Sequence, residues 1–293
     1  MRRARLIYNP TSGREEMRRR LPDILQRLDE GGIETTVHAT TGEGDATLAA
    51  ADAARRGYDI VIAAGGDGTI YEVVNGLADQ EHRPELGVFP LGTTNDLSRA
   101  LGISRQWEDY CDLVLRGESR PIDVGRANDR YFINIAGGGS LTELTYEVPS
   151  RLKTMIGQLA YYFKGIEKMV NLSPMQLKID AEGQGPIEGE FMIFLIGNTN
   201  SVGGFERLMP DARIDDAQLD VILLKKCNLA EFIRVVSMAQ RGDHFNDPNV
   251  IYFRTPRLEV TSPNDVLLNL DGELGGRLPG VFEVLPQHLR VFA

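Results

Sequence analysis

Glycine, hydroxyl and acidic residues gather in five short segments of this sequence, which are NPTSG (9–13), GGDGT (65–69), GTTND (92–96), PDARIDD (210–216) and NLDGE (269–273). The first three segments suit loops whose main-chain N–H groups bind phosphate. Asp67 would repel a bare phosphate, so we expect its partner to be a magnesium ion carried by a nucleotide, or a group that positions the phosphates indirectly. The Walker loop is absent, and Tyr71 replaces the third glycine of the dinucleotide pattern. For GGDG alone, an ordinary strand-to-helix turn stays an alternative.

The two later segments concentrate carboxylates. PDARIDD, with Asp220 beyond it, crowds four acids before a strand, which is costly without a cation or strong solvation. A solvated loop is the alternative reading. NLDGE places Asp271 and Glu273 across a tight turn, which suits a general base steadied by a neighbour. A hairpin with surface acids is the alternative there.

Alternating strand and helix patterns predict where the first three loops lie. The apolar run Ile60–Ala64 predicts a strand buried on both faces, and apolar residues at 70, 73, 74 and 77 predict a helix after the glycines. Further strands at 5–8, 33–39 and 86–91, with helices after NPTSG and over 45–56, complete a parallel-sheet pattern. Ligands bind beyond the carboxyl ends of such strands, so we expect the three loops to converge there.

A change of pattern near Pro121 predicts a second domain. Short strands are expected around 122–126 and 131–136, and Gly137–Gly139 lead to a helical region through Asn171. Strand-like runs follow at 175–182, 188–198, 219–225, 251–261 and 265–270, with one helix at 229–239. This pattern favours a sandwich or barrel. We therefore predict an α/β domain over 1–121 and a β domain over 122–293.

Composition narrows the classes of function. The chain has 293 residues, 42% hydrophobic and 25% charged, and its net charge of −10 argues against a nucleic-acid partner. Residues 1–27 nevertheless carry eight arginines against three acids. No leader-like segment and no run of about 18 apolar residues is present, so we expect a cytoplasmic protein. Two distant cysteines and four isolated histidines predict neither a disulfide nor a zinc site.

The five segments, in this order, resemble those of the soluble bacterial diacylglycerol kinases, within the wider group of lipid kinases that includes sphingosine kinases. The resemblance covers essentially the whole chain. It implies a Rossmann-like nucleotide-binding α/β domain, a C-terminal β-sandwich whose end can pack back on the first domain, and an active site in the cleft between them. It also implies ATP- and magnesium-dependent phosphorylation of the free hydroxyl of 1,2-diacylglycerol at a membrane surface, which gives phosphatidic acid for phospholipid biosynthesis.

The resemblance assigns roles to individual residues. Glu273 would be the base, and Asp67 and Asp96 would join the charged network around the phosphates. Apart from the resemblance, the spacing of Asp271 from Glu273 makes it the next candidate base. The implied ATP contacts are Asn9, Pro10, Thr11, Ser12, Gly13, Thr40, Gly66, Asp67, Gly68, Thr69, Ile70, Tyr71, Glu72 and Thr93. A structural magnesium would use the Asp216 carboxylate and main-chain oxygens of Arg213 and Gln218. The basic positions that match lipid-headgroup contacts are Arg14, Arg19 and Lys164.

Two departures and several alternatives accompany this reading. The family usually has Asn at the position of Tyr71, and close relatives often have Lys at that of Arg14. An NAD kinase-like enzyme shares GGDGT, a related kinase could use another lipid, and a lipid-binding regulator could lack turnover. GTTND and NLDGE favour the lipid kinases, and the presence of both Asp67 and Glu273 favours an enzyme. The expected partners are ATP, diacylglycerol in the membrane and anionic lipid, with a homodimer left open.

Overall fold

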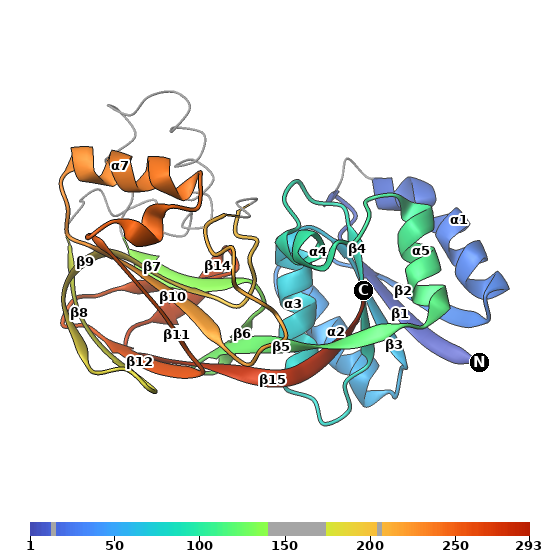
Figure 1. Cartoon of the computed structure of the whole chain (residues 1–293). Coiled ribbons are helices and arrows are strands. Elements are labelled where there is room, and N and C mark those ends of the chain that lie inside the picture. The colour runs from blue at the N-terminus through green and yellow to red at the C-terminus, as the bar shows by residue number, and fades with distance from the viewer. Residues whose placement is uncertain (13–15, 140–173, 204–206) are drawn as a thin grey trace. The chain divides into compact units, whose positions relative to one another are not determined.

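A computed structural model of the chain describes residues 1–12, 16–139, 174–203 and 207–293 (Figure 1). The chain forms two compact units, which we call unit 1 (residues 1–123 and 286–293) and unit 2 (residues 124–285). The division falls within strand β5 (Ser119–Ala127), two residues beyond the predicted boundary. The last strand, β15 (Gly280–Phe292), also contributes residues to both units.

Unit 1 contains a parallel sheet. Its strands are β1 (Arg2–Tyr8), β2 (Ile33–Ala39), β3 (Ile60–Gly65) and β4 (Glu85–Pro90). They lie in the order β2-β1-β3-β4, and the end of β15 continues the sheet where Val291 pairs with Leu86. Every residue of β3 is buried, which accounts for its unbroken apolar sequence because both faces of a central parallel strand are covered.

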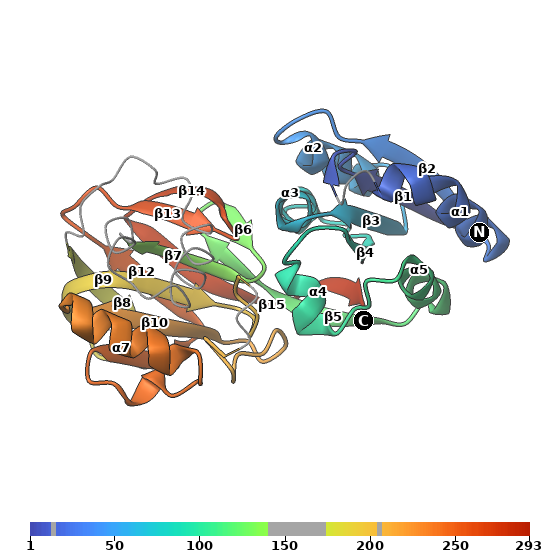
Figure 2. The ribbon, with the colours of Figure 1, turned by 90° about the horizontal axis from the view of Figure 1, so that it is seen from above.

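Helices cover both faces of this sheet (Figures 1 and 2). Their bounds are α1 (Glu16–Glu30), α2 (Asp45–Arg55), α3 (Asp67–Ala78), α4 (Asp96–Leu101) and α5 (Trp107–Arg116). α2 and α3 lie on one face, and α1 and α5 lie on the other. α2 buries only alanines and approaches α3 so closely that a Cβ on Gly76 would lie 2.3 Å from the Thr47 carbonyl oxygen. Small residues therefore allow α2 and α3 to pack closely against each other.

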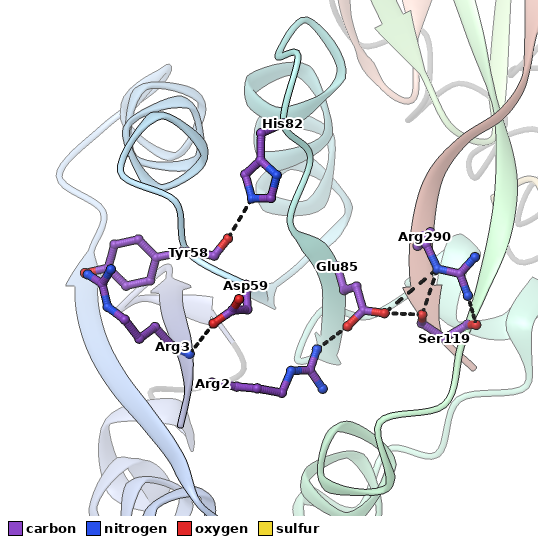
Figure 3. Close-up of polar contacts among 8 residues, drawn as sticks. All are labelled: Arg2, Arg3, Tyr58, Asp59, His82, Glu85, Ser119 and Arg290. Carbon is purple, nitrogen blue, oxygen red and sulfur yellow. Dashed lines mark hydrogen bonds and ion pairs between the residues drawn. The ribbon is translucent and has the colours of Figure 1, made fainter.

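Polar contacts join the amino-terminal ends of β1, β4 and β5 to the carboxyl end of β15 (Figure 3). Glu85, the first residue of β4, accepts hydrogen bonds from Arg2 and from the Ser119 hydroxyl. The Arg290 Nε donates to Ser119 Oγ at 3.0 Å and lies 3.9 Å from Glu85 Oε1. These contacts fix the last strand to unit 1 at the edge of the sheet that is opposite to the predicted loops.

Unit 2 is antiparallel. Its strands are β6 (Arg130–Phe132), β7 (Ile135–Gly139), β8 (Met175–Ala181), β9 (Ile187–Gly197), β10 (Leu219–Lys225), β11 (Val250–Thr255), β12 (Arg257–Thr261), β13 (Leu267–Leu270) and β14 (Glu273–Arg277). The main order is β14-β13-β7-β9-β8-β12-β15, and β10 pairs with both β9 and β11. Helix α7 (Leu229–Ala239) begins with an Asn228 capping box and shares a core with β9 and β10, as Phe232 and Leu224 do.

Most predicted elements of unit 2 that fall on described residues are present, with one correction. The run predicted at 251–261 divides at Pro256 into β11 and β12, because proline cannot donate a ladder hydrogen bond. Gly137–Gly139 form the end of β7. A Cβ on Gly137 would lie 2.5 Å from the Phe194 carbonyl oxygen, so the close approach of β9 explains this glycine. The helical region predicted through Asn171 lies outside the described residues.

Candidate functional site

Asp67 joins two of the predicted loops. It is the first residue of α3, where the positive end of the helix dipole favours a negative charge. Its carboxylate accepts hydrogen bonds from the main-chain amides of Asn95 at 3.0 Å and Asp96 at 2.9 Å. Asp96 is the first residue of α4 and is fully buried. The structure therefore brings GGDGT and GTTND together at the carboxyl edge of the sheet, as the sequence predicts.

The same two loops approach main chain to main chain. A Cβ on Gly92 would lie 2.7 Å from the Cα of Gly66, so glycine is required for this spacing. Asn95 has a φ of 51° and is fully buried, and its Nδ2 donates to the Gly65 carbonyl at 3.1 Å. Its Oδ1 is buried and has no hydrogen-bond partner among the described residues. Such an acceptor suits a ligand or water that supplies a donor. The sequence analysis gave Asn95 no role.

The NPTSG segment forms a turn beside these loops. The Asn9 amide donates to the Ala64 carbonyl at 3.2 Å, which joins the ends of β1 and β3. The Thr11 amide and hydroxyl both donate to Asn9 Oδ1, at 2.9 and 2.8 Å. Asn9 thus shapes the turn with its own side chain, as turn-forming asparagines do. The third predicted loop therefore lies at the same edge of the sheet. Gly13 and Arg14 lie outside the described residues.

Glu72 stabilises a neighbouring helix. Its two carboxylate oxygens accept the amides of Gly44 and Ala46, both at 3.0 Å, at the start of α2. This residue was predicted to contact ATP, and in the structure both of its oxygens form a helix cap. The predicted contacts Ile70 and Tyr71 have buried side chains. A nucleotide contact at those two positions would therefore come from the main chain.

Asp45 fixes the loop that carries Thr40. Its Oδ2 accepts the amide and the hydroxyl of Thr41, at 2.7 and 2.9 Å, and these bonds lower the pKa of Asp45. His38 Nε2 lies 3.1 Å from Asp45 Oδ1, and Arg5 Nη2 lies 3.3 Å from His38 Nδ1. A guanidinium cannot accept a hydrogen bond, so Nδ1 is the unprotonated nitrogen and Nε2–H donates to Asp45.

Asp271 and Glu273 have different surroundings in unit 2. Asp271 is buried and has a φ of 52°. Its carboxylate accepts three main-chain amides, from Ile133 at 2.6 Å, Asn134 at 2.8 Å and Ile135 at 2.9 Å. Glu273 is exposed. The geometry therefore gives Asp271 a structural task, the fixing of the segment before β7, and leaves Glu273 as the accessible carboxylate of the hairpin.

Arg254 of β11 provides a counter-ion for the acidic turn. Asp216 Oδ1 accepts the Gln218 amide at 3.1 Å, and the other oxygen accepts a hydrogen bond from Arg254. Arg254 Nε also lies 3.6 Å from Asp220 Oδ2. Burial raises the pKa of Asp220, and a hydrogen bond from Tyr252 opposes that shift. Arg254 is 38 residues distant from Asp216, so the sequence could not show that it balances these acids.

Magnesium fits this turn by donor chemistry, because a carboxylate and main-chain carbonyl groups are the hard oxygen ligands that the ion prefers. Arg254 occupies one of the Asp216 oxygens in the structure. Within the described part of the chain, no three His, Cys, Asp or Glu side chains gather as a metal site. A magnesium ion at this turn would therefore need main-chain oxygens as ligands, and the predicted ligands Arg213 and Gln218 would supply such oxygens.

The predicted lipid-facing residues are only partly described. Arg19 is an exposed residue of α1. Arg14 and Lys164 lie outside the described residues. Among the helices that the structure describes, none has the length and apolar character that a bilayer crossing requires.

Comparison with known proteins decides the family. Residues 3–127 match the Diacylglycerol kinase catalytic domain, and residues 143–293 match the YegS C-terminal NAD kinase beta sandwich-like domain. A protein of Bacillus subtilis strain 168 named Diacylglycerol kinase is 57% identical over 99% of this chain and 96% of its own length. This chain belongs to the diacylglycerol kinase family. The expected family and fold class, a nucleotide-binding α/β domain followed by a β-sandwich, are thereby confirmed.

Further relatives and solved structures match nearly the whole chain at lower identity. A Diacylglycerol kinase of Staphylococcus aureus strain RF122 is 47% identical over 99% of this chain and 92% of its own length. A crystal structure of a diacylglycerol kinase from Bacillus anthracis strain Sterne superposes with a TM-score of 0.77 at 26% identity, covering 99% of this chain and 96% of that one. An NAD kinase from Archaeoglobus fulgidus, in complex with ATP, has a TM-score of 0.55 at 13% identity, which shows a shared fold alone.

Proposed function

We propose that this protein transfers the γ-phosphate of ATP to the free hydroxyl of 1,2-diacylglycerol and so produces phosphatidic acid at a membrane surface. The catalytic domain and the full-length relatives support a kinase that uses ATP. The observation that carries the proposal is the contact of the Asp67 carboxylate with the amides of Asn95 and Asp96. It assembles two loops of this family into one arrangement at the sheet edge where ligands bind.

Unit 1 would hold the nucleotide mainly through its main chain. Gly66 and Gly92 bring two backbones together without side chains between them, and α3 begins directly after that contact. Amides at a helix start favour phosphate groups. The buried Oδ1 of Asn95 faces no donor among the described residues, so a bound ligand or its water can supply one. Asn9 and Thr11 shape the turn that follows β1 at the same edge.

Glu273 would act as the general base. A neutral alcohol is a weak nucleophile, so a positioned carboxylate that takes its proton lowers the barrier. As the lipid oxygen forms its bond to the γ-phosphorus, the bond from that phosphorus to the oxygen of the β-phosphate breaks. ADP then leaves with that electron pair, and the hydroxyl proton passes to Glu273. Asp271 would position the hairpin, since its carboxylate is already bonded to three amides.

Magnesium, when bound with ATP, would supply electrostatic stabilisation of the phosphate charge. Asp67 and Asp96 meet at the contact between the two loops and are the acids of unit 1 that would interact with this magnesium ion. A second magnesium at Asp216, with the main chain of Arg213 and Gln218, would stabilise the acidic turn. Contact of Arg14, Arg19 and Lys164 with anionic lipid would bring the enzyme to its substrate.

A lipid phosphorylation assay tests the proposal. The purified chain is incubated with labelled ATP, magnesium and vesicles that contain 1,2-diacylglycerol, and labelled phosphatidic acid is measured. Parallel reactions replace the diacylglycerol with ceramide, a sphingoid base or NAD. The Asp67→Ala variant, whose fold is checked by circular dichroism, should lose turnover because positioning supplies most of the catalysis in phosphoryl transfer. Transfer to NAD alone, or no transfer to any acceptor, would overturn the assignment.

A further inference from the structure

Two arginines outside the predicted site hold the carbonyl groups of the GTTND loop. Arg105 Nη2 donates to the carbonyl oxygens of Thr93 at 2.9 Å and Thr94 at 3.0 Å. Arg99 Nε donates to the same Thr94 oxygen at 2.9 Å. Arg99 comes from α4, and Arg105 comes from the connection between α4 and α5. The two side chains therefore reach one peptide group from different parts of the chain.

That peptide group also reaches Asp67. The carbonyl of Thr94 and the amide of Asn95 belong to the same planar unit and point in opposite directions. The carbonyl accepts from Arg99 and Arg105, while the amide donates to Asp67 Oδ2 at 3.0 Å. Cationic donors on a carbonyl polarise the peptide and strengthen the hydrogen bond that its N–H donates. The arginines therefore act on the Asp67 carboxylate across one peptide.

We propose that Arg99 and Arg105 are positioning residues for Asp67 and act through the Thr94–Asn95 peptide. The proposal rests on the function proposed above, because it gives these arginines a part in the same phosphoryl transfer. These arginine contacts matter because of the local backbone conformation of the loop. Asn95 has a φ of 51°, in the left-handed region that non-glycine residues adopt infrequently, and no regular strand or helix fixes the residues between β4 and Asn95.

The exposure of the two arginines separates this role from a contribution to the core. Both residues are exposed, and the contacts given above are with carbonyl groups of a surface loop. Exposed contacts of this kind contribute little to global stability. Their removal should therefore change the loop and the reaction, with the melting temperature nearly unchanged.

The test compares Arg99→Gln, Arg105→Gln and the double variant with Arg116→Gln. Arg116 is a matched control, because it is an exposed arginine of unit 1 whose Nε lies 3.4 Å from the Asp112 carbonyl and does not touch the loop. The measurements are hydrogen exchange of the Asn95 and Asp96 amides, melting temperature, kcat, KM for ATP, and the affinity for ADP. Arg105→Lys keeps the charge without the planar fork and tests how much of the effect is geometric.

We expect exchange of both amides to be about 10-fold faster in the double variant, the effect of losing a charge-assisted hydrogen bond. We expect kcat to fall by a similar factor, with partial recovery in Arg105→Lys and no change in Arg116→Gln. In the Asp67→Asn background, Arg105→Gln should change ADP affinity less than it does in the native chain. Unchanged exchange, or a kcat loss that is matched by a loss of stability, would overturn the proposal. If the exchange changes in a chain without kinase activity, the proposed function fails and the positioning of Asp67 by the two arginines stands.

Discussion

Neighbouring carboxylates have different surroundings in this protein. Asp271 is buried and accepts three main-chain amides, whereas Glu273 is exposed two residues later. A buried carboxylate bonded to three amides contributes to the structure, whereas the exposed carboxylate of Glu273 is accessible to solvent. The sequence shows the pair but not this division, because the amides that bind Asp271 come from residues 133–135, more than 130 positions earlier.

Substitution of the pair should separate activity from stability. Glu273→Gln keeps the size of the side chain and removes its basicity, so we expect turnover to fall by about 10² to 10⁴-fold with the melting temperature unchanged. Asp271→Asn places an NH₂ group among amide donors, and we expect it to lower the free energy of unfolding by about 2 kcal/mol or more. Initial rates and thermal melts of both variants make the comparison. Native turnover in Glu273→Gln would instead make Asp271 the candidate base.

His244 should make the fold sensitive to acid. Its Nε2 lies 3.0 Å from the Leu208 carbonyl oxygen and its Nδ1 is buried. Burial lowers the pKa of this histidine, and the contact with the Leu208 carbonyl and the charge of Asp243 oppose that shift. The unfolded chain, with a histidine pKa of about 6.5, then binds the proton more readily than the folded chain. Stability is therefore complete above about pH 6.5 and falls as pH drops below it, by at most about 1.4 kcal/mol per pH unit.

Melting temperatures at pH 7.5 and 5.0 measure this effect. His244→Gln should reduce the difference between the two temperatures, because the residue that takes up the proton on unfolding is gone. His82→Gln is the control, since His82 is exposed. An equal pH dependence in all three proteins would show that other groups account for it.

At the scale of elements, helices and strands with a regular local pattern could be predicted from the sequence, whereas contacts between distant residues could not. β3 was predictable because both of its faces are buried, and α2 because its alanines recur at helical spacing. The sequence gives no sign of β14, which reads Glu-Leu-Gly-Gly-Arg. Pro286 and the positive φ of Gln287 interrupt the pattern of β15. The convergence of the loops followed from parallel topology, but the main-chain contact of Asp67 depends on a conformation of Asn95 that sequence does not specify.

The acidic turn provides a prediction at this scale. Asp216 and Asp220 share Arg254, so Arg254→Gln leaves two neighbouring carboxylates without their guanidinium. We expect this variant to melt at a lower temperature in EDTA and to recover more than the native chain when magnesium is added, because a cation relieves the repulsion. Arg213→Gln is the control, since Arg213 is exposed and pairs with Asp215 in the same turn. If magnesium changes the melting temperature of none of the three proteins, a metal-binding role for the acidic turn is excluded.

At the scale of the whole molecule, the charge is unevenly distributed. The net charge is −10, yet eight arginines stand among residues 1–27. Arg19 is one of the exposed arginines of α1. A basic segment on an acidic protein can select one face for an anionic membrane, at about 1 kcal/mol for each well-placed charge.

Vesicle sedimentation tests this orientation. Binding to vesicles that contain phosphatidylglycerol should weaken as salt increases, and it should weaken about five-fold in Arg19→Gln and in Lys164→Gln. Arg55→Gln, an exposed arginine at the end of α2, should bind like the native chain. Equal binding by all variants at every salt concentration would mean that another face meets the lipid.

Unit 1 is built from two segments of the chain, and this has a consequence for its synthesis on the ribosome. Translation delivers residues 1–123 first, and the 162 residues of unit 2 (124–285) must follow before residues 286–293 emerge. Until then, β4 lacks the partner that Val291 provides and presents an open edge to other chains. The unit that is translated first is therefore completed last. A nascent chain that stalls within unit 2 would leave that edge for a chaperone to cover.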